Sequence, residues 1–314
     1  MNMRTKTSVS SLFALAALFF VAGCGGSRQA ILRTADAVAE EAVKEDYDIT
    51  AMAKLAAGFN PKDFSGKRIR RYSDSELDRL GAVLGTVTFY FPENYEQVEM
   101  LESVFVEMSE RNILDEPGIR GMYRTYLGAR LFSKAAELRQ RFPGIKFYSM
   151  PEKIVSELPP GVKAWRVYAV PDDGRTIEAK ASKLGEGRKI VMLMLPGCGV
   201  SEKAMRELLD DPAFGPAFQG HGVVLTSRIN AESVALWKSH FAFPEVYLAY
   251  KSSDFPGFDF DSSPNFYFLR DGAIKYNFTG WSNNGNPDFG RTEMTKGLAA
   301  ISVSSEPAVS GGGN

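Results

Sequence analysis

Apolar residues recur every three or four positions through most of residues 28–142, which predicts a mostly helical region. This region begins with an Ala- and Glu-rich segment, residues 28–57. The apolar positions of that segment near helical spacing are Ile31, Leu32, Ala35, Val38, Ala42 and Val43. Further along, Ser73 and Glu76 have the spacing of a capping box, in which each side chain bonds the backbone N–H of the other residue. That pattern predicts a helix beginning after Ser73.

Two more helices are predicted before residue 143. Residues 95–110 would place one apolar stripe on a helix face, formed by Val98, Leu101, Val104, Phe105 and Met108. Pro117 suits the first turn of the next helix, and the apolar spacing extends that helix through Leu131 toward Leu138. Pro143 and Gly144 then end it. We expect the Met and aromatic residues of these helices to form a core and not a ligand site.

The pattern changes near residue 145 to short apolar runs separated by turn residues. Strands are predicted at residues 166–170, 189–195, 223–225, 265–269 and 274–278. The run KIVMLML, residues 189–195, is continuously apolar, as is typical of a buried parallel strand. Helices are predicted at 201–209 and 231–240, and RDGA at residues 270–273 forms a hairpin turn. Strands that alternate with helices and end in a hairpin predict a mixed α/β sheet.

Composition narrows the possible functions. The chain has 314 residues, with 37 Lys and Arg against 38 Asp and Glu, so its net charge is -1. No basic stripe for binding phosphates is evident, and we expect no nucleic-acid partner. Only His221, His240, Cys24 and Cys198 could supply imidazole or thiolate ligands, which is too few for a zinc site. We therefore expect no metal and no cofactor, with both histidines at surface or satisfied core positions.

The first 24 residues have the features of a secretory leader. Arg4 and Lys6 are followed by an apolar stretch, residues 12–21, that is too short to span a membrane comfortably. The stretch ends in VAGC, which resembles the lipobox of bacterial lipoproteins. This resemblance implies cleavage before Cys24 and acylation of its thiol, for example with palmitate. The alternatives are an ordinary signal peptide or an uncleaved anchor in which the cysteine occurs by chance.

Several expectations follow from the lipobox resemblance. Acyl chains would hold the protein on a membrane, and residues 24–27 would form a lipidated tether with Gly25 and Gly26 as its flexible part. Because Gly25 is not Asp, the resemblance favours the outer membrane, with the protein facing the periplasm. Acylation would consume Cys24, which leaves Cys198 as the one thiol of the mature chain.

The surroundings of Cys198 resemble the active-site turn of thioredoxin-like proteins. A buried strand leads into Cys198-Gly199-Val200-Ser201 at a predicted helix start, and Ser263-Pro264 begins the later strand–turn–strand unit. With the DDGRTIEA hairpin upstream, the pattern is similar to membrane-associated thioredoxin-like proteins of the bacterial envelope over about residues 160–290. The resemblance implies a cis Ser263–Pro264 bond beside Cys198. It gives Cys198, Ser201 and Pro264 as the candidate catalytic residues.

Three departures from the thioredoxin pattern limit this chemistry. Ser201 occupies the position of the second cysteine, so the motif is of the monothiol type. Gly197 replaces the usual aromatic residue before the first cysteine, and the strand before it lacks the usual buried acid. Free cysteines are also often buried and inert. Tyr247, Tyr250, Phe255, Phe258 and Phe260 could line a peptide groove, although a place in the core is favoured for most of them.

Together these patterns predict an α/β protein with a thioredoxin-like C-terminal domain preceded by a mostly helical N-terminal domain. The expected divisions are the signal peptide at 1–23, the tether at 24–27, the helical domain at 28–145, the thioredoxin-like domain at 150–300 and a disordered tail at 301–314. The expected function is thiol–disulfide exchange through one cysteine, with thiol- or disulfide-bearing envelope proteins as partners. The alternative is a non-catalytic binding or scaffold lipoprotein that has a degenerate thioredoxin fold.

Overall fold

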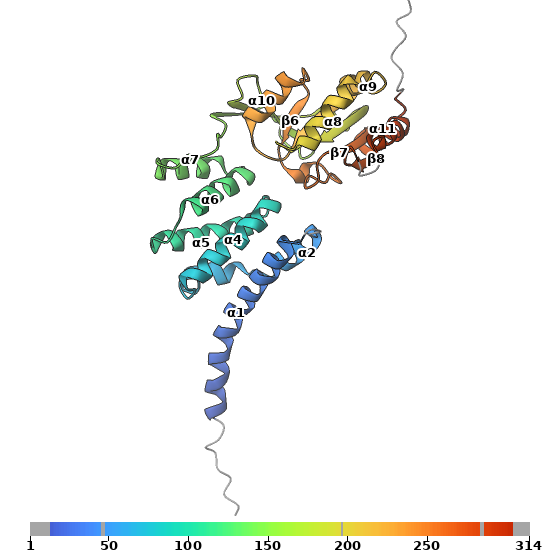
Figure 1. Cartoon of the computed structure of the whole chain (residues 1–314). Helices are drawn as coiled ribbons and strands as arrows, with labels where there is room; N and C mark the ends of the chain where they lie inside the picture. Colours follow the sequence, from blue (N-terminus) through green and yellow to red (C-terminus); the bar gives the residue numbers. More distant parts are fainter. Residues whose placement is uncertain (1–12, 45–47, 196, 283–285, 304–314) are drawn as a thin grey trace, which may run out of the picture. The chain divides into compact units, whose positions relative to one another are not determined.

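The computed structural model describes residues 13–44, 48–195, 197–282 and 286–303, with side chains from residue 28 onward (Figure 1). The chain divides into two compact units, Met1–Phe147 and Tyr148–Asn314. The first unit contains a helical region, and the second contains one eight-stranded sheet with helices. Within the described residues, no helix combines the length and apolar character needed to cross a membrane.

Helices and short turns of helix make up the regular structure described in the first unit. In chain order they are α1 (Phe13–Ala42), α2 (Ile49–Ala56), the 3-10 turn η1 (Pro61–Phe64), α3 (Gly66–Ile69), α4 (Asp74–Tyr90), α5 (Tyr95–Glu110), α6 (Glu116–Gly128) and α7 (Phe132–Arg141). The Ser73–Glu76 capping box is present at the start of α4, as predicted. The predicted apolar stripe of α5 is buried along its whole length.

Two details of the predicted helices are wrong. The helix that begins near Pro117 does not continue to Leu138, because Arg130 adopts a left-handed backbone with φ 60° between α6 and α7. A left-handed residue cannot propagate a right-handed helix, so the chain turns there. Val43 lies just beyond the end of α1 and is 83% exposed, so it does not share the buried face of Ile31, Leu32 and Val38.

The strands of the second unit are β1 (Lys153–Ser156), β2 (Arg166–Ala169), β3 (Thr176–Ala181), β4 (Arg188–Leu193), β5 (Gly222–Thr226), β6 (Val246–Ala249), β7 (Asn265–Arg270) and β8 (Ala273–Thr279). They form one sheet in the order β1-β3-β2-β6-β5-β4-β7-β8. The helices of this unit are α8 (Gly199–Asp210), α9 (Gly215–His221), α10 (Ala231–His240) and α11 (Phe289–Ala300). Two short 3-10 turns are η2 (Lys183–Gly185) and η3 (Ser252–Asp254).

The centre of this sheet explains the continuous apolar run that the sequence shows at β4. β4 pairs in parallel with β5 on one side and antiparallel with β7 on the other, and β7 pairs antiparallel with β8. Residues Ile190 to Leu193 of β4 are buried, because a central strand covered on both faces has no solvent side. β4, β5, β7 and β8 thus form a continuous group of four neighbouring strands, and the candidate site lies at one end of it.

Four of the five proposed groove aromatics lie in or against the hydrophobic core of this unit, whereas Tyr250 is half-buried and stacks on Tyr168 with ring centroids 4.9 Å apart. Phe255 and Phe260 are 1% and 8% exposed and lie among the buried residues of the sheet. Phe258 is partly buried and stacks on Tyr267, with ring centroids 4.2 Å apart. The side chain of Tyr247 also packs against this core. A place in the core, which the sequence favoured for these residues, is therefore confirmed for all four.

Candidate functional site

Cys198 lies where β4 passes into α8. Its backbone N–H donates to the carbonyl of Leu195 at 3.1 Å, and its own carbonyl accepts the Glu202 N–H at 3.0 Å. Cys198 is thus the N-cap of α8, with extended backbone angles. Gly197 has φ 80°, a left-handed conformation that glycine adopts without steric cost. This turn places the thiol at the positive end of the helix, next to backbone N–H groups that have no partner within the helix.

The segment before β7 returns to the same end of β4. β7 runs antiparallel to β4 and pairs Asn265 with Leu193, so residue 263 lies level with the chain that leaves β4. The Ser263–Pro264 peptide bond is cis, which confirms the prediction from sequence. The Cys198 Sγ lies 4.0 Å from the Ser263 carbonyl oxygen. Cys198 and the Ser263–Pro264 segment therefore lie together, as expected.

Ser201 and Ser263 form a hydrogen-bonded pair beneath the thiol. The Leu195 N–H donates to Ser263 Oγ at 3.1 Å, and the Ser201 and Ser263 hydroxyl oxygens are 2.6 Å apart. Because Ser263 Oγ already accepts from Leu195, its own O–H remains available to donate to Ser201 Oγ. With Ser263 as the donor, the Ser201 O–H is free to donate to the Cys198 thiolate, and this hydrogen bond favours a lower pKa of Cys198. The Ser201 side chain is fully buried, so water cannot replace it in this chain of bonds.

Asp259 holds the loop that carries Ser263. Its carboxylate accepts the Asp261 N–H at 2.9 Å and the Ser262 hydroxyl at 2.7 Å. Its backbone carbonyl accepts the side-chain amide of Asn265 at 3.0 Å, and Asn265 is 1% exposed at the start of β7. The residues on both sides of Ser263 are therefore fixed to one another, which orients the Ser263 hydroxyl toward Ser201.

Opposing effects act on the Cys198 thiol. Burial would by itself raise the pKa of Cys198, because a thiolate loses hydration. The Ser201 hydroxyl and the backbone N–H groups of Ser201 and Val200 favour the thiolate more strongly, with a smaller effect of Ser263, so the pKa of Cys198 is held below its ordinary value. A lowered pKa increases the fraction of thiolate, which is the nucleophilic form.

The immediate neighbours of the thiol leave it open on one side. Cys198 itself is half-buried, whereas Gly197 and Gly199 are exposed. The apolar side chain of Val200 is 49% exposed directly after them. A partner that approaches the thiol would therefore meet glycine backbone and one apolar side chain.

The other candidate residues lie away from this cluster or outside the described part. Residue 24 falls within α1, but the side chain of Cys24 is outside the described residues, so its acylation stays a prediction. His221 ends α9 and is half-buried, and His240 ends α10, where its ring lies 4.7 Å from that of Phe241. Among the described residues, no group of three or more His, Cys, Asp or Glu could hold a metal ion.

The sequence did not indicate that the Ser263 hydroxyl bonds to Leu195 and Ser201. The residue was noted because it precedes Pro264, but its hydroxyl bonds to residues 62 and 68 positions away along the chain. No local pattern reports a partner at that separation. The available signal was the resemblance itself, which places this segment beside Cys198 and so brings a second hydroxyl next to Ser201.

Comparison with known proteins gives only distant neighbours. No family model matches the chain, and no protein of curated function matches it. One structural neighbour is a thioredoxin-like protein from Bacteroides caccae, 9% identical over 80% of this chain and 82% of that chain, with a TM-score of 0.28. Another is an uncharacterized conserved protein from Geobacillus kaustophilus, 12% identical over 48% of this chain and 94% of that chain, with a TM-score of 0.33. Similarities this low add no argument about function.

Proposed function

We propose that the second unit is a thioredoxin-like domain that exchanges thiols and disulfides through Cys198, on a chain that is acylated at Cys24 and held on a membrane of the bacterial cell envelope. The observation that supports it most is the set of hydrogen bonds that lowers the pKa of Cys198. A structural thiol has no need of a stabilised thiolate, whereas a nucleophile does.

The order of elements around Cys198 supports the thioredoxin-like assignment. The chain order is β4, α8, α9, β5, α10, β6, η3, β7, β8 and α11, and the four strands β4, β5, β7 and β8 lie in the sheet in the order β5-β4-β7-β8. The cysteine follows the first of these strands and the Ser263–Pro264 segment precedes the third. This is the order of motifs on which the resemblance in sequence depends. β1, β2, β3 and β6 extend the same sheet beyond β5.

The proposed reaction is an exchange of one disulfide for another. The Cys198 thiolate attacks one sulfur of a partner disulfide, the new S–S bond forms as the old one breaks, and the second partner sulfur leaves as a thiolate that takes a proton from water. No net oxidation occurs in this step. Donors from Ser201 and Val200 favour the thiolate before the attack and lose that role once the mixed disulfide has formed.

Ser201 determines how the mixed disulfide is resolved. A second thiol at this position could attack the mixed disulfide from within the same turn, but a serine hydroxyl cannot. The mixed disulfide of Cys198 should therefore persist until an outside thiol attacks it, and that thiol regenerates the Cys198 thiolate. The proposal is accordingly a monothiol exchange protein that depends on a separate reductant.

The alternative, a binding or scaffold lipoprotein without redox chemistry, is favoured by the same serine. Ser201 is fully buried and bonded to Ser263, so it completes a satisfied polar cluster whether or not Cys198 reacts. In that case the exposed surface at Gly197, Gly199 and Val200 would bind a partner without forming a covalent bond. The two functions differ in one measurable property, which is the reactivity of the thiol.

The test is the pH dependence of Cys198 alkylation in the full chain, followed by mass spectrometry of the peptide that contains it. We expect the rate to reach half its maximum at a pH below about 8.5, the ordinary value for a free cysteine. The same chain in denaturant provides the unperturbed reference. A thiol that titrates above that reference and resists alkylation when folded would reject the exchange function in favour of the binding lipoprotein.

A further inference from the structure

A dense group of basic side chains lies between α2 and α4. Residues 62–71, KDFSGKRIRR, contain five Lys or Arg residues and one acidic residue, Asp63. The five basic residues are all exposed, and they are Lys62, Lys67, Arg68, Arg70 and Arg71. This local group of basic residues was not singled out from the sequence. The net charge of -1 conceals it because the compensating acidic residues lie elsewhere in the sequence.

Ion pairs neutralise only part of this group. Arg68 pairs with Asp63 at 2.9 Å, and Arg70 has only long contacts with Glu107 at 3.9 Å and Glu110 at 3.8 Å. Within the described chain, no carboxylate lies at ion-pair distance from Lys62, Lys67 or Arg71. We call these three side chains the basic surface.

The C-terminal end of this segment, at Arg71 and Tyr72, lies near the first part of α1. Arg71 directly precedes Tyr72, whose ring centroid is 6.0 Å from the guanidinium of Arg28. Arg28 also pairs with Glu76 in the first turn of α4. Arg28 is four residues after Cys24 in the same helix, which is about 6 Å along the axis at 1.5 Å per residue. The chain at Arg71 and Tyr72 therefore lies close to the position proposed for the acyl anchor, and Lys62 and Lys67 belong to the same short segment.

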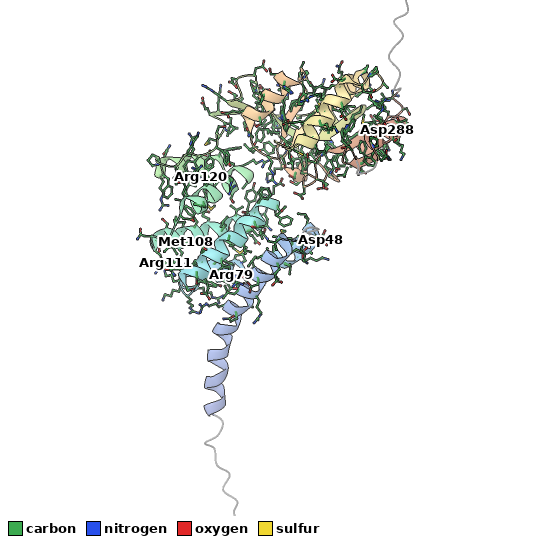
Figure 2. The ribbon with its side chains drawn as sticks, in the orientation of Figure 1. Asp48, Arg79, Met108, Arg111, Arg120 and Asp288 are labelled. Atoms are coloured by element: carbon green, nitrogen blue, oxygen red, sulfur yellow. The ribbon has the colours of Figure 1, made fainter. Side chains whose placement is uncertain are left out.

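The first charged residues of α1 after residue 24 are also basic. Residues 24–33, CGGSRQAILR, contain Arg28 and Arg33 and no acidic residue, and the first acid is Asp36. Asp36 pairs with Arg79 of α4 (Figure 2). Arg28 is neutralised by Glu76, so Arg33 is the basic residue that α1 adds to the charge of the segment that follows α2. A surface of this charge is complementary to a layer of phosphate groups.

We propose that the basic surface binds anionic phospholipid headgroups of the membrane that holds the acyl anchor. The proposal rests on acylation of Cys24, which would hold Lys62, Lys67 and Arg71 near the bilayer surface. Each basic residue near an anionic bilayer strengthens binding about fivefold, and the attraction declines over about 8 Å at physiological salt. The contact would be a second membrane signal that fixes the orientation of the first unit on the bilayer.

The test uses the full chain, purified in detergent and placed in lipid nanodiscs of phosphatidylcholine with or without phosphatidylglycerol. A membrane-impermeant reagent acetylates exposed lysines, and mass spectrometry follows Lys67. We expect Lys67 to react at least about fivefold more slowly on the anionic discs, and the difference to vanish at about 1 M salt, where the Debye length is about 3 Å. Lys62→Glu/Arg71→Glu should abolish the protection of Lys67. Lys163→Glu/Lys183→Glu, an equal charge change at exposed residues of the second unit, should retain it.

The possible outcomes separate this proposal from the anchor. Mass spectrometry of the same samples reports whether Cys24 is acylated. Equal Lys67 rates on both discs with Cys24 acylated would overturn the basic surface, as would protection that survives Lys62→Glu/Arg71→Glu. Protection by a polynucleotide in solution, with none on anionic discs, would overturn it in favour of a nucleic-acid site. Protection without acylation would support the surface and reject the anchor.

Discussion

Ser201→Ala offers a direct test of how the protein stabilises the Cys198 thiolate. The substitution removes one hydroxyl that favours the thiolate and leaves the backbone N–H donors of Ser201 and Val200 in place. A hydrogen bond to a charged group contributes about 1.5–3 kcal/mol, and one pKa unit corresponds to about 1.4 kcal/mol. Because Cys198 is half-buried, solvent on its open side already stabilises part of the thiolate charge, and we expect the lower end of that range. The pKa of Cys198 should rise by about one unit.

The expected change in reactivity is smaller than the change in pKa. Well below both pKa values, a rise of one unit lowers the thiolate fraction about tenfold. A more basic thiolate is a better nucleophile, and a Brønsted coefficient of about 0.4–0.5 recovers about threefold of that loss. The rate of attack on a model disulfide at low pH should therefore fall about threefold. At a pH above both pKa values, the variant should react about threefold faster than the wild type.

The assay is a pH series of alkylation for the pKa and a parallel series of disulfide exchange for the rate. Ser239→Ala, at an exposed position on α10, is the matched control and should change neither. Ser263→Ala should raise the pKa less than Ser201→Ala, because the Ser263 hydroxyl lowers the pKa of Cys198 less than the Ser201 hydroxyl does. An unchanged pKa in Ser201→Ala would refute the hydrogen-bond explanation. The explanation would also be refuted if Ser201→Ala did not become faster than the wild type at high pH.

Four further predictions follow from the site, the two units and the anchor. Ser201→Cys should shorten the lifetime of the mixed disulfide and give or raise insulin-reductase turnover. Cys198→Ser should form no mixed disulfide. An unchanged lifetime in Ser201→Cys would argue against the proposed resolution step. Gly297→Ala places a Cβ against the fully buried ring of Phe268, and it should lower the free energy of urea unfolding of the second unit by about 3 kcal/mol or more. The control Gly220→Ala, whose added Cβ has nothing within 4 Å, should change that free energy by less than about 1 kcal/mol. Arg111→Ala removes hydrogen bonds to Glu107 and to the carbonyls of Arg70 and Tyr72, and it should destabilise the first unit by about 2 kcal/mol. Arg120→Ala, at an exposed pair with Glu116, should destabilise it less (Figure 2). Equal losses of stability in the two variants would contradict this expectation. Cys24→Ala should abolish labelling by a fatty acid in growing cells, and equal label in both proteins would remove the lipid anchor from the account.

Elements whose signals are local could be predicted from the sequence. The capping box at Ser73 fixes where α4 begins, the apolar stripe fixes α5 at the predicted bounds, and α10 also has the bounds that were predicted for it. The break at Arg130 could not be predicted, because apolar spacing continues across it and only the packing of α6 and α7 requires the turn. β1 and β6 are four residues each, and strands that short depend on neighbouring strands more than on their own pattern.

The candidate site divides in the same way. Cys198 and Ser201 could be found from four consecutive residues and the apolar strand before them. Ser263 gains its role from the antiparallel pairing of β7 with β4, which brings it beside Ser201 from a distant part of the chain. The basic surface was overlooked for a related reason, since whole-chain charge balance hides a local excess whose position relative to α1 depends on the fold.

The central claim is that Cys198 is a working nucleophile, and its reaction with a disulfide is the most direct test. The measurement is the rate at which Cys198 in the folded full chain forms a mixed disulfide with a small aromatic disulfide near pH 7, compared with the same chain in denaturant. Mass spectrometry of the Cys198 peptide separates this adduct from any at Cys24. We expect a faster reaction in the folded protein, because the folded site favours the thiolate. A folded thiol that reacts more slowly than the unfolded one, or not at all, would contradict the account.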